Sequence, residues 1–320
     1  MSVLSAPHFH NEKAAYAYVE ARLWPNGPVC PRCKGTDRIG KMGGESTRIG
    51  TYKCYACRKP FTVKVGTIFE ASHVPMRHWL QVMYFMASSK KGISTNQIQR
   101  TLGCHMKTAW FVGHRVREAM TDGSFAPFGG GGGDVEADET FIGQAPDAVR
   151  KSGPRGHRHM NTVFTIVDRQ TGRAHSQVMP TPTSKNINDA LVENVARDTR
   201  LLTDSAPYYL RSTWTFQDHR RVNHSIGEYV NADDATIHTN TVEGVFSIFK
   251  RGMKGIYQHC AAKHLHRYAA EFDFRYSNRK ALGIDDVARA DKVLAGVVGK
   301  RLMYPGLSAR RPGAEARVVW

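Results

Sequence analysis

The segment from Val135 to Gly143 reads VEADETFIG, and it decides the fold of the larger part of this chain. Its residues suit a β-strand, in which successive side chains point to opposite faces. On such a strand Glu136 and Asp138 share one face, and Glu139 points to the other. A charged side chain in an apolar strand is costly to bury unless it is paired or binds a metal ion, so we expect a site here.

The elements that follow this strand indicate the fold class. The β-branched and aromatic stretch 161–168 (NTVFTIVD) and residues 174–179 predict two further strands. Apolar spacing predicts a helix over 186–199, a fourth strand over 201–204 and a later helix over 242–251. A three-stranded meander followed by helix, strand and helices is the order of an RNase H-like α/β fold with a mixed sheet.

Three acidic residues of this region could meet at one site. Asp138 lies inside the first strand, Asp204 ends the fourth strand, and Glu243 lies near the start of a helix. Carboxylate oxygens are the ligands that Mg²⁺ and Mn²⁺ prefer, so we expect the three acids to hold two such ions for phosphodiester transfer. Lys250 lies two helical turns after Glu243 and can contact a phosphate beside the metal site. Each acid alone would be read as a surface carboxylate.

Four cysteines form a second predicted metal site nearer the N-terminus. Cys30 and Cys33 lie in CPRC, and Cys54 and Cys57 lie in CYAC after a gap of 20 residues. Two such turns supply the four thiolates of a zinc ribbon, with no open position for water, so the sequence predicts one structural Zn²⁺. Zinc ribbons bind DNA, RNA or protein, so this module alone does not identify a partner.

A helix-turn-helix pattern follows the cysteines. Apolar spacing predicts a helix over 75–88, and Ser94 with Gln97 forms a capping box that begins a short helix ending before Gly103. A second helix is predicted from about Met106 to Met120. The residues that it would present toward DNA or solvent are Lys107, Thr108, His114, Arg115 and Arg117. An ordinary helical hairpin with a solvated basic face is the alternative.

The composition favours a nucleic-acid partner. The chain of 320 residues has a net charge of +17, which predicts attraction to a polyanion. Its apolar runs are too short to span a bilayer, and its first residues do not resemble a signal peptide, so we expect no membrane partner and a location in a reducing cytoplasm. In that compartment paired cysteines indicate a metal site rather than disulfides.

Basic residues are concentrated again between residues 250 and 280. Interleaved aromatic residues accompany them, and only two acidic residues oppose them. Such side chains can neutralise phosphates, with a solvated charged face as the alternative. The DNA contacts that we predict here are Lys250, Arg251, Lys254 and Arg275.

These motifs together resemble insertion-sequence transposases with a DDE-type catalytic domain, in the subgroup that carries an N-terminal zinc ribbon. The resemblance runs from about residue 12 to residue 279 and rests on CPRC, CYAC, DETFIG (138–143), Asp204, VNHS (222–225), NTVE (240–243) with Lys250, and EFDFRY (271–276). It implies an enzyme of the nucleoid that binds double-stranded transposon ends as a homo-oligomer, cleaves them and joins their 3′-hydroxyls to target DNA.

The resemblance leaves one ligand open. Some relatives have asparagine in place of the third acid, and Asn240 lies one helical turn before Glu243. We favour Glu243 because a carboxylate binds Mg²⁺ better than an amide does.

The sequence predicts five regions. Five consecutive glycines, Gly129–Gly133, are expected to form a flexible linker. The regions are an N-terminal helix and zinc ribbon (1–70), a helix-turn-helix DNA-binding domain (71–128), the glycine linker (129–133), the RNase H-like domain (134–290) and a basic C-terminal tail (291–320).

Two other functions are compatible with this organisation. The first is a DNA-binding regulator, derived from a transposase, whose catalytic domain is inactive; the complete set of acids argues against it. The second is a nuclease of the same fold that acts on RNA–DNA hybrids. The zinc ribbon and the helix-turn-helix favour recognition of a DNA duplex instead.

Overall fold

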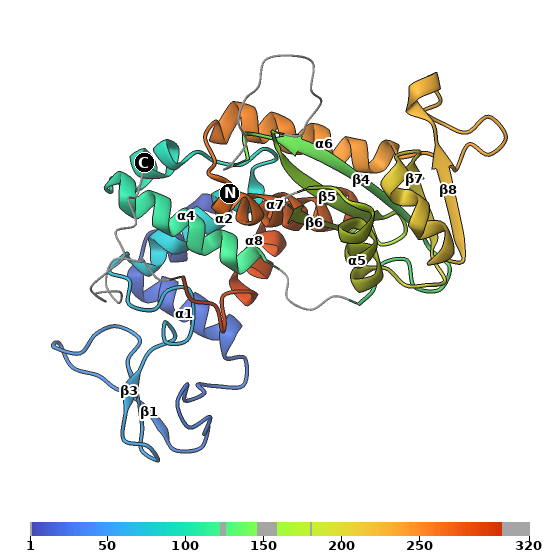
Figure 1. Cartoon of the computed structure of the whole chain (residues 1–320). Helices are drawn as coiled ribbons and strands as arrows, with labels where there is room; N and C mark the ends of the chain where they lie inside the picture. The colour runs from blue at the N-terminus through green and yellow to red at the C-terminus, as the bar shows by residue number, and fades with distance from the viewer. Residues whose placement is uncertain (1, 122–125, 146–158, 180, 303–320) are drawn as a thin grey trace, which may run out of the picture.

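A five-stranded mixed sheet lies at the centre of the C-terminal half of the chain. The computed structural model describes residues 2–121, 126–145, 159–179 and 181–302 (Figure 1). The sheet is built from β4 (Asp134–Ile142), β5 (Asn161–Asp168), β6 (Ala174–Met179), β7 (Arg200–Asp204) and β8 (Asp218–Val222), in the spatial order β6-β5-β4-β7-β8. Strands β4, β5 and β6 are antiparallel neighbours, whereas β7 runs parallel to both β4 and β8. The predicted meander and fourth strand are therefore present, and β8 is an additional strand.

Helices cover both faces of this sheet, which explains why every residue of β5 is buried. Phe164 and Ile166 of β5 face α5 (Ser184–Asn194) and a 3-10 helix (Pro207–Trp214). On the opposite face Val163 and Val167 pack against α6 (Asn240–Gly252), and Val163 also packs against α7 (Ala262–Ser277). Alternate apolar residues of β5 thus pack against the helices on opposite faces of the sheet. The acidic residues of β4 lie in the same sheet, between these two layers of helices.

The N-terminal half consists of a small three-stranded ribbon and a bundle of helices. The ribbon strands are β1 (Ile39–Lys41), β2 (Tyr52–Cys54) and β3 (Pro60–Phe61), and the helices are α1 (Glu12–Leu23), α2 (Met76–Ser88), α3 (Thr95–Leu102) and α4 (Met106–Met120). The predicted pair of helices around Gly103 is therefore present, with Gly103 ending α3 in the left-handed conformation. Figure 1 shows the ribbon at one end of the molecule and the five-stranded sheet at the other.

The C-terminal helix returns to the N-terminal bundle, which corrects the predicted tail. Helix α8 (Asp286–Ala295) packs against α1, α2 and α4, and Val293, Leu294 and Val297 are buried in the same apolar core as Trp79. The expected boundary at residue 291 therefore falls inside a packed helix. Residues 303–320, the larger part of the predicted tail, lie outside the described residues.

The glycine run is not a flexible linker. Gly129–Gly133 forms a tight turn in which the N–H of Gly133 donates to the carbonyl of Gly129 at 2.8 Å. The N–H of Gly129 donates to Asp168 at 3.2 Å. Gly129 has a φ of +71°, and a Cβ there would lie 2.4 Å from Thr199 Oγ1. Glycine is required because this turn is packed onto the sheet that it precedes.

The two halves of the chain share a buried ion cluster between α4 and α7. Arg117 of α4 donates to Glu271 of α7 at 2.7 Å, and Arg275 of α7 also donates to Glu271. All three side chains are buried. The predicted helix-turn-helix and RNase H-like regions are therefore joined through a common interior. None of the described helices is long and apolar enough to cross a bilayer.

Candidate active site

Parallel pairing of β4 and β7 brings two aspartates to the same edge of the sheet. Asp134 pairs with Arg200, and Glu136 pairs with Leu202. Two residues beyond this pairing lie Asp138 and Asp204, where β7 ends, and they are close enough that the charge of Asp204 contributes to raising the pKa of Asp138. The sequence names Asp138 from inside one strand and Asp204 from the end of another, and the two strands are neighbours in the sheet.

Glu136 fixes the helix that carries the third acid. Its side chain is fully buried, and its Oε2 accepts a 2.8 Å hydrogen bond from the main-chain N–H of Val242 in the first turn of α6. Its Oε1 accepts one of 2.6 Å from Arg169 Nε. A carboxylate is favourable at a helix N-terminus, where main-chain N–H groups lack partners within the helix. The bond holds the start of α6 over β4 and so positions Glu243, the next residue along the helix.

A histidine links Glu243 to the edge of the sheet. His224 follows β8, and its Nε2 lies 3.5 Å from Glu243 Oε1 and 3.2 Å from Thr239 Oγ1. His224 also acts on Asp204, since its charge lowers the pKa of that carboxyl. The imidazole therefore lies within electrostatic range of two of the three acids.

The acids repel one another and are hard to ionise together. Burial, then the charge of Glu139, then the charges of Asp204 and Glu243 raise the pKa of Asp138 well above its ordinary value. Burial also raises the pKa of Asp204, against a hydrogen bond from the N–H of Ala206. Burial raises the pKa of Glu139 to about 7, although Tyr209 Oη donates to it at 2.9 Å. A neighbouring positive charge would favour the ionised form of these carboxyl groups.

The donor set fits divalent metal ions. Among the described residues, neither Asp138 nor Asp204 forms an ion pair with a lysine or arginine, and Glu243 pairs only with His224. The ligand atoms of the three acids are carboxylate oxygens, which suit Mg²⁺ or Mn²⁺. The three acids do not bring one oxygen each within 4.8 Å of one another. The three carboxyl groups are therefore near enough to interact electrostatically, but they do not form one closed set of ligands in this structure.

The basic residues predicted on α6 lie on its surface. Lys250, Arg251 and Lys254 are all exposed, and Lys250 lies on the same side of the helix as Glu243 because seven residues make almost two turns. Asn240, the alternative third ligand, is exposed at the first position of α6. Glu243 is the α6 residue whose charge reaches Asp138.

The four predicted zinc ligands converge. Their sulfur atoms all lie within 4.8 Å of one another, with 3.6 Å between Cys30 and Cys57 and between Cys33 and Cys54. Zn–S bonds of about 2.3 Å place the sulfurs of a tetrahedral site about 3.8 Å apart. The two knuckles have the same shape, since Lys34 and Arg58, each next after the second cysteine of its pair, both have positive φ. The site fits a structural Zn²⁺.

Two predicted DNA contacts are instead interior residues. Arg115 is 4% exposed and donates to the carbonyls of Ile68 at 2.6 Å and Glu70 at 2.9 Å. Arg275 is 6% exposed and pairs with Glu271. Both guanidinium groups bind partners inside the protein. Arg115 and Arg275 are therefore not among the DNA contacts that we propose. His114 and Arg117, which were grouped with them, are also buried.

The remaining contacts predicted on α4 lie in its first turn. Lys107 is exposed and Thr108 is half-buried, immediately after the turn that joins α3 to α4. The side chain of Ser94 accepts a hydrogen bond of 3.2 Å from the N–H of Gln97, which gives α3 the predicted start. The structure thus supplies a short α3 and a longer α4, with Met106 and Lys107 exposed at the start of α4.

Three residues with defined roles at the site were given none by the sequence. Glu136 was placed on the face of Asp138, but its partner lies 106 positions away. Tyr209 donates a hydrogen bond to Glu139, which lies 70 positions earlier in the sequence. His224 contacts Glu243, which belongs to a different element. The pattern of each segment does not reveal such pairs. Only the motif VNHS (222–225) within the family resemblance could have indicated His224.

Comparison with known proteins identifies two domains. Residues 131–277 match the ISXO2-like transposase domain, and residues 10–60 match the transposase zinc-ribbon domain. The chain is 27% identical over 257 residues to an uncharacterized protein in transposable element ISH50 of Halobacterium salinarum, covering 76% of this chain and 83% of that protein.

Two solved structures show only weak similarity. A simian T-cell lymphotropic virus intasome in complex with PP2A regulatory subunit B56 gamma aligns with a TM-score of 0.29 and 12% identity, over 55% of this chain and 63% of that chain. The Mos1 strand transfer complex aligns with a TM-score of 0.17 and 12% identity, over 65% of this chain and 79% of that chain.

Proposed function

This chain belongs to the insertion-sequence transposases that join an N-terminal zinc ribbon to an ISXO2-like transposase domain, and we propose that it is a DDE-type enzyme that cleaves and joins DNA strands with divalent metal ions. The observation that carries the proposal is the cluster of Asp138, Asp204 and Glu243. Asp138 and Asp204 lie on neighbouring strands and Glu243 lies on α6. Burial and Glu139, followed by the charges of Asp204 and Glu243, raise the pKa of Asp138, and none of the three acids has a lysine or arginine partner among the described residues.

Each of the three acids has a proposed role as a metal ligand. Asp138 and Asp204 supply oxygens from adjacent strands, and Glu243 supplies them from α6. When bound, two Mg²⁺ or Mn²⁺ ions activate the attacking oxygen and stabilise the leaving oxygen of a phosphodiester. The strand order β6-β5-β4-β7-β8, with the first three strands antiparallel, is the arrangement that we assign to an RNase H-like domain.

Neighbouring residues position these ligands and the DNA. Glu136 holds the start of α6, and His224 holds the Glu243 side chain from the β8 side. Lys250 is exposed on the Glu243 side of α6, where it can bind a phosphate of the scissile strand. Arg251 and Lys254 extend this basic surface along the DNA backbone.

Recognition of the element ends is assigned to the N-terminal half. Helices α3 and α4 form a helix-turn-helix, with Lys107 and Thr108 at the start of the recognition helix. The zinc ribbon supplies a second contact with the double-stranded end. Joining two ends to one target requires two active sites, so we propose a homo-oligomer that assembles on DNA at the nucleoid.

The decisive experiment follows a supercoiled donor plasmid that carries the terminal inverted repeats. The wild-type protein is expected to cleave it with Mg²⁺ or Mn²⁺ and to lose cleavage when the ions are removed. Asp138→Asn should reduce cleavage at least about 1,000-fold while repeat binding persists, because the main loss is of a metal ligand. Asp189→Asn, at an exposed acid on α5, is the matched control and should behave like wild type.

Two results would contradict the proposal. Equal behaviour of the wild type and Asp138→Asn, with repeat binding intact, would identify a DNA-binding regulator without catalysis. Cleavage of RNA–DNA hybrids by a protein that ignores the repeats would identify a nuclease of a different specificity.

A further inference from the structure

The most exposed large apolar side chain among the described residues lies near the acidic cluster. Trp214 is 91% exposed, so almost all of its indole ring is free to contact a partner. Tryptophan is enriched at binding surfaces because its ring offers a large, rigid apolar area. Leu210, on the same 3-10 helix, is 51% exposed. None of the roles proposed above uses either residue.

The backbone that carries Trp214 is held firmly. The 3-10 helix Pro207–Trp214 is fixed at two points. Its buried Tyr209 donates a hydrogen bond of 2.9 Å to β4, and Thr213 Oγ1 lies 3.0 Å from His219 Nδ1 of β8. The indole is thus presented to solvent from a helix that is attached to two strands, which reduces the entropy lost when a ligand binds.

This helix lies beside the acidic cluster. The His219 ring that contacts Thr213 also lies, through its Nε2, 2.9 Å from Oγ1 of Thr203, the residue before Asp204. The 3-10 helix has 8 residues and is therefore about 16 Å long. Trp214 is thus within a few stacked nucleotides of Asp204, at about 3.4 Å for each nucleotide.

Three exposed arginines lie near Trp214. Arg211 lies one turn earlier on the same side of the helix, because residues three apart eclipse in a 3-10 helix. Arg197 Nη1 donates to the carbonyl of the residue after Trp214 at 3.2 Å. Arg221 lies on the same face of β8 as His219, nearer to the acids. The indole ring therefore lies in a basic environment.

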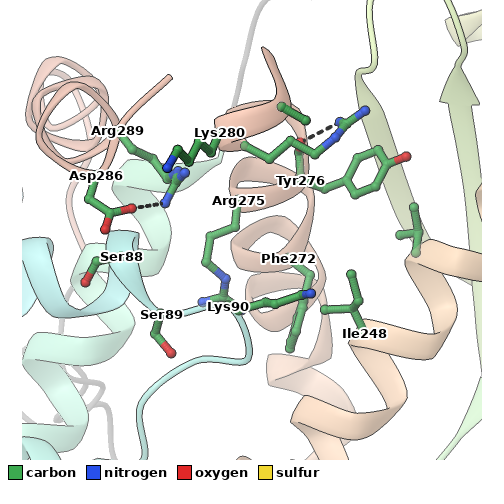
Figure 2. Close-up of a pocket in the computed structure, with 13 residues that line it drawn as sticks. Ser88, Ser89, Lys90, Ile248, Phe272, Arg275, Tyr276, Lys280, Asp286 and Arg289 are labelled. Carbon is green, nitrogen blue, oxygen red and sulfur yellow. Dashed lines mark hydrogen bonds and ion pairs between the residues drawn. The ribbon is translucent and has the colours of Figure 1, made fainter. Parts of the chain in front are cut away.

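The charges of these three arginines are not used inside the protein. Figure 2 shows the contrasting case of Arg289, whose guanidinium pairs with Asp286 at 2.7 Å. Arg220, on the opposite face of β8, pairs with Asp218 at 2.7 Å. The arginines near Trp214 form no such ion pair with any carboxylate in the described part of the chain. Their charges are therefore available to phosphate groups.

An exposed indole beside unpaired arginines suits single-stranded DNA. The face of a base can stack on an aromatic ring where the base is unpaired, whereas neighbouring base pairs cover it inside a duplex. Arginine guanidinium groups bind the adjoining phosphates. A second copy of this chain fits less well, because its net charge of +17 would bring like charges to the arginines.

We infer that Trp214, with Arg197, Arg211 and Arg221, binds single-stranded DNA, with one unpaired base stacked on the indole. The arginines hold the phosphates on either side of that base. The inference rests on the proposed function for the source of the strand, which is DNA that is unpaired beside the cleaved phosphodiester. The surface keeps this strand near the acids between cleavage and joining.

The test measures binding of a labelled thymidine oligonucleotide of about 12 nucleotides to the full-length protein in a chelating buffer. Trp214→Ala is expected to weaken binding about tenfold because stacking is lost, whereas Trp214→Phe should retain most of it. A blunt duplex of the same length should bind the wild type and Trp214→Ala almost equally. Thermal unfolding of both variants should match the wild type, because the side chain is exposed.

The salt dependence of binding reports the arginine contacts separately. Arg211→Gln with Arg221→Gln should make the slope of log affinity against log salt concentration shallower by about 1.4, since each phosphate contact of a single strand contributes about 0.7. Arg220→Gln is the matched control and should leave the slope unchanged, because its charge is already paired. Trp214→Ala should also leave the slope unchanged, since it removes no charge.

The inference fails if Trp214→Ala binds the single strand as tightly as the wild type does, or if it weakens binding of the duplex to the same extent. A lower oligomer mass of Trp214→Ala in analytical ultracentrifugation, with unchanged strand binding, would instead assign the indole to a contact between copies. Asp138→Asn should bind the strand like the wild type, so failure of the proposed catalysis is seen separately.

Discussion

At the scale of single residues, Asp138 shows how a cluster of buried acids reduces folding stability. Its carboxyl group is part-buried beside three other acids, and its pKa is raised well above the ordinary value of 3.8. The protonated form is therefore favoured in the folded state, whereas the unfolded chain ionises normally. Ionisation of this group costs folding free energy until a cation compensates it.

The pH dependence of stability follows from this shift. Because the folded pKa is above the unfolded one, the contribution of Asp138 to stability is fully present below its unfolded pKa and is lost as pH rises through the folded pKa. In a chelating buffer, Asp138→Asn should therefore be more stable than wild type at neutral pH, with the difference shrinking toward about pH 4. Urea unfolding at a series of pH values measures this difference.

The effect of Mg²⁺ on stability tests whether Asp138 belongs to a cation site. Mg²⁺ should raise the urea midpoint of the wild type, because a ligand that binds only the folded state stabilises it, and should have a much smaller effect on Asp138→Asn. Equal responses of the two proteins to Mg²⁺ would show that Asp138 is not part of a cation site.

The sequence could single out the acids because Asp138 lies among apolar residues of a strand, Asp204 ends a strand and Glu243 lies in the first turn of a helix. It could not identify Glu136, Tyr209 or His224 as their partners, because those contacts join segments that are far apart in the chain. It was wrong about Arg115 and Arg275, which are buried. Helical spacing separates one face of a helix from another, but it does not say whether a basic residue meets DNA or a buried carboxylate.

At the scale of elements, Glu136 makes the position of α6 depend on one side chain of β4. Glu136→Gln leaves Arg169 without its buried carboxylate and weakens the bond to the N-terminus of α6. We expect a loss of about 3–5 kcal/mol of unfolding free energy, together with a fall in strand cleavage, because Glu243 is no longer held. Glu193→Gln, at an exposed glutamate on α5, is the control. A stable, fully active Glu136→Gln protein would contradict this role.

Two substitutions in the glycine turn test whether this run is a packed turn or a flexible linker. Gly129→Ala places a methyl group 2.4 Å from Thr199 Oγ1 at a φ of +71°, whereas Gly130→Ala meets nothing within 4 Å. Gly129→Ala should therefore lower the unfolding free energy by about 1–3 kcal/mol or more, and Gly130→Ala should change it little. Equal stability of the two variants in thermal unfolding would restore the interpretation of this run as a flexible linker.

Elements with strong local signals were predicted well from sequence. The bounds of α3 agree with its capping box and its terminal Gly103. Strand β8 was missed because its sequence, DHRRV, has almost no apolar residues, as is common at the exposed edge of a sheet. The predicted helix over 186–199 ends at Asn194, since Val195 forms a bridge with Phe128 instead.

At the scale of the whole molecule, the ion cluster of Arg117, Glu271 and Arg275 joins the N-terminal bundle to the sheet domain. Glu271→Gln leaves two buried guanidinium groups without a carboxylate, so we expect a loss of about 3–5 kcal/mol of unfolding free energy. The loss should appear in both halves, as a lower temperature for a single shared thermal transition. Glu45→Gln, at an exposed acid, is the control. Two separate transitions in the wild type would show that the halves fold independently.

The zinc ribbon is expected to behave differently, because its own small core surrounds the cysteines. A zinc-selective chelator should unfold β1–β3 while most of the helical circular dichroism remains, since metal binding drives folding of such modules. Trp24 reports this change by its fluorescence, because it packs against Tyr52 and Phe61. Binding of the element ends should be lost at the same time. Unimpaired end binding by Cys30→Ser with Cys54→Ser would contradict this prediction.

The return of α8 to the N-terminal bundle has a consequence for the synthesis of the protein. The core around Trp79 is incomplete until Val293, Leu294 and Val297 have left the ribosome. A nascent or prematurely terminated chain therefore carries the helices that we assign to DNA recognition without the apolar surface that closes them. Such a product would be prone to degradation. Truncated copies of the gene should thus yield little protein able to compete with the full-length chain for the DNA ends that we propose it binds.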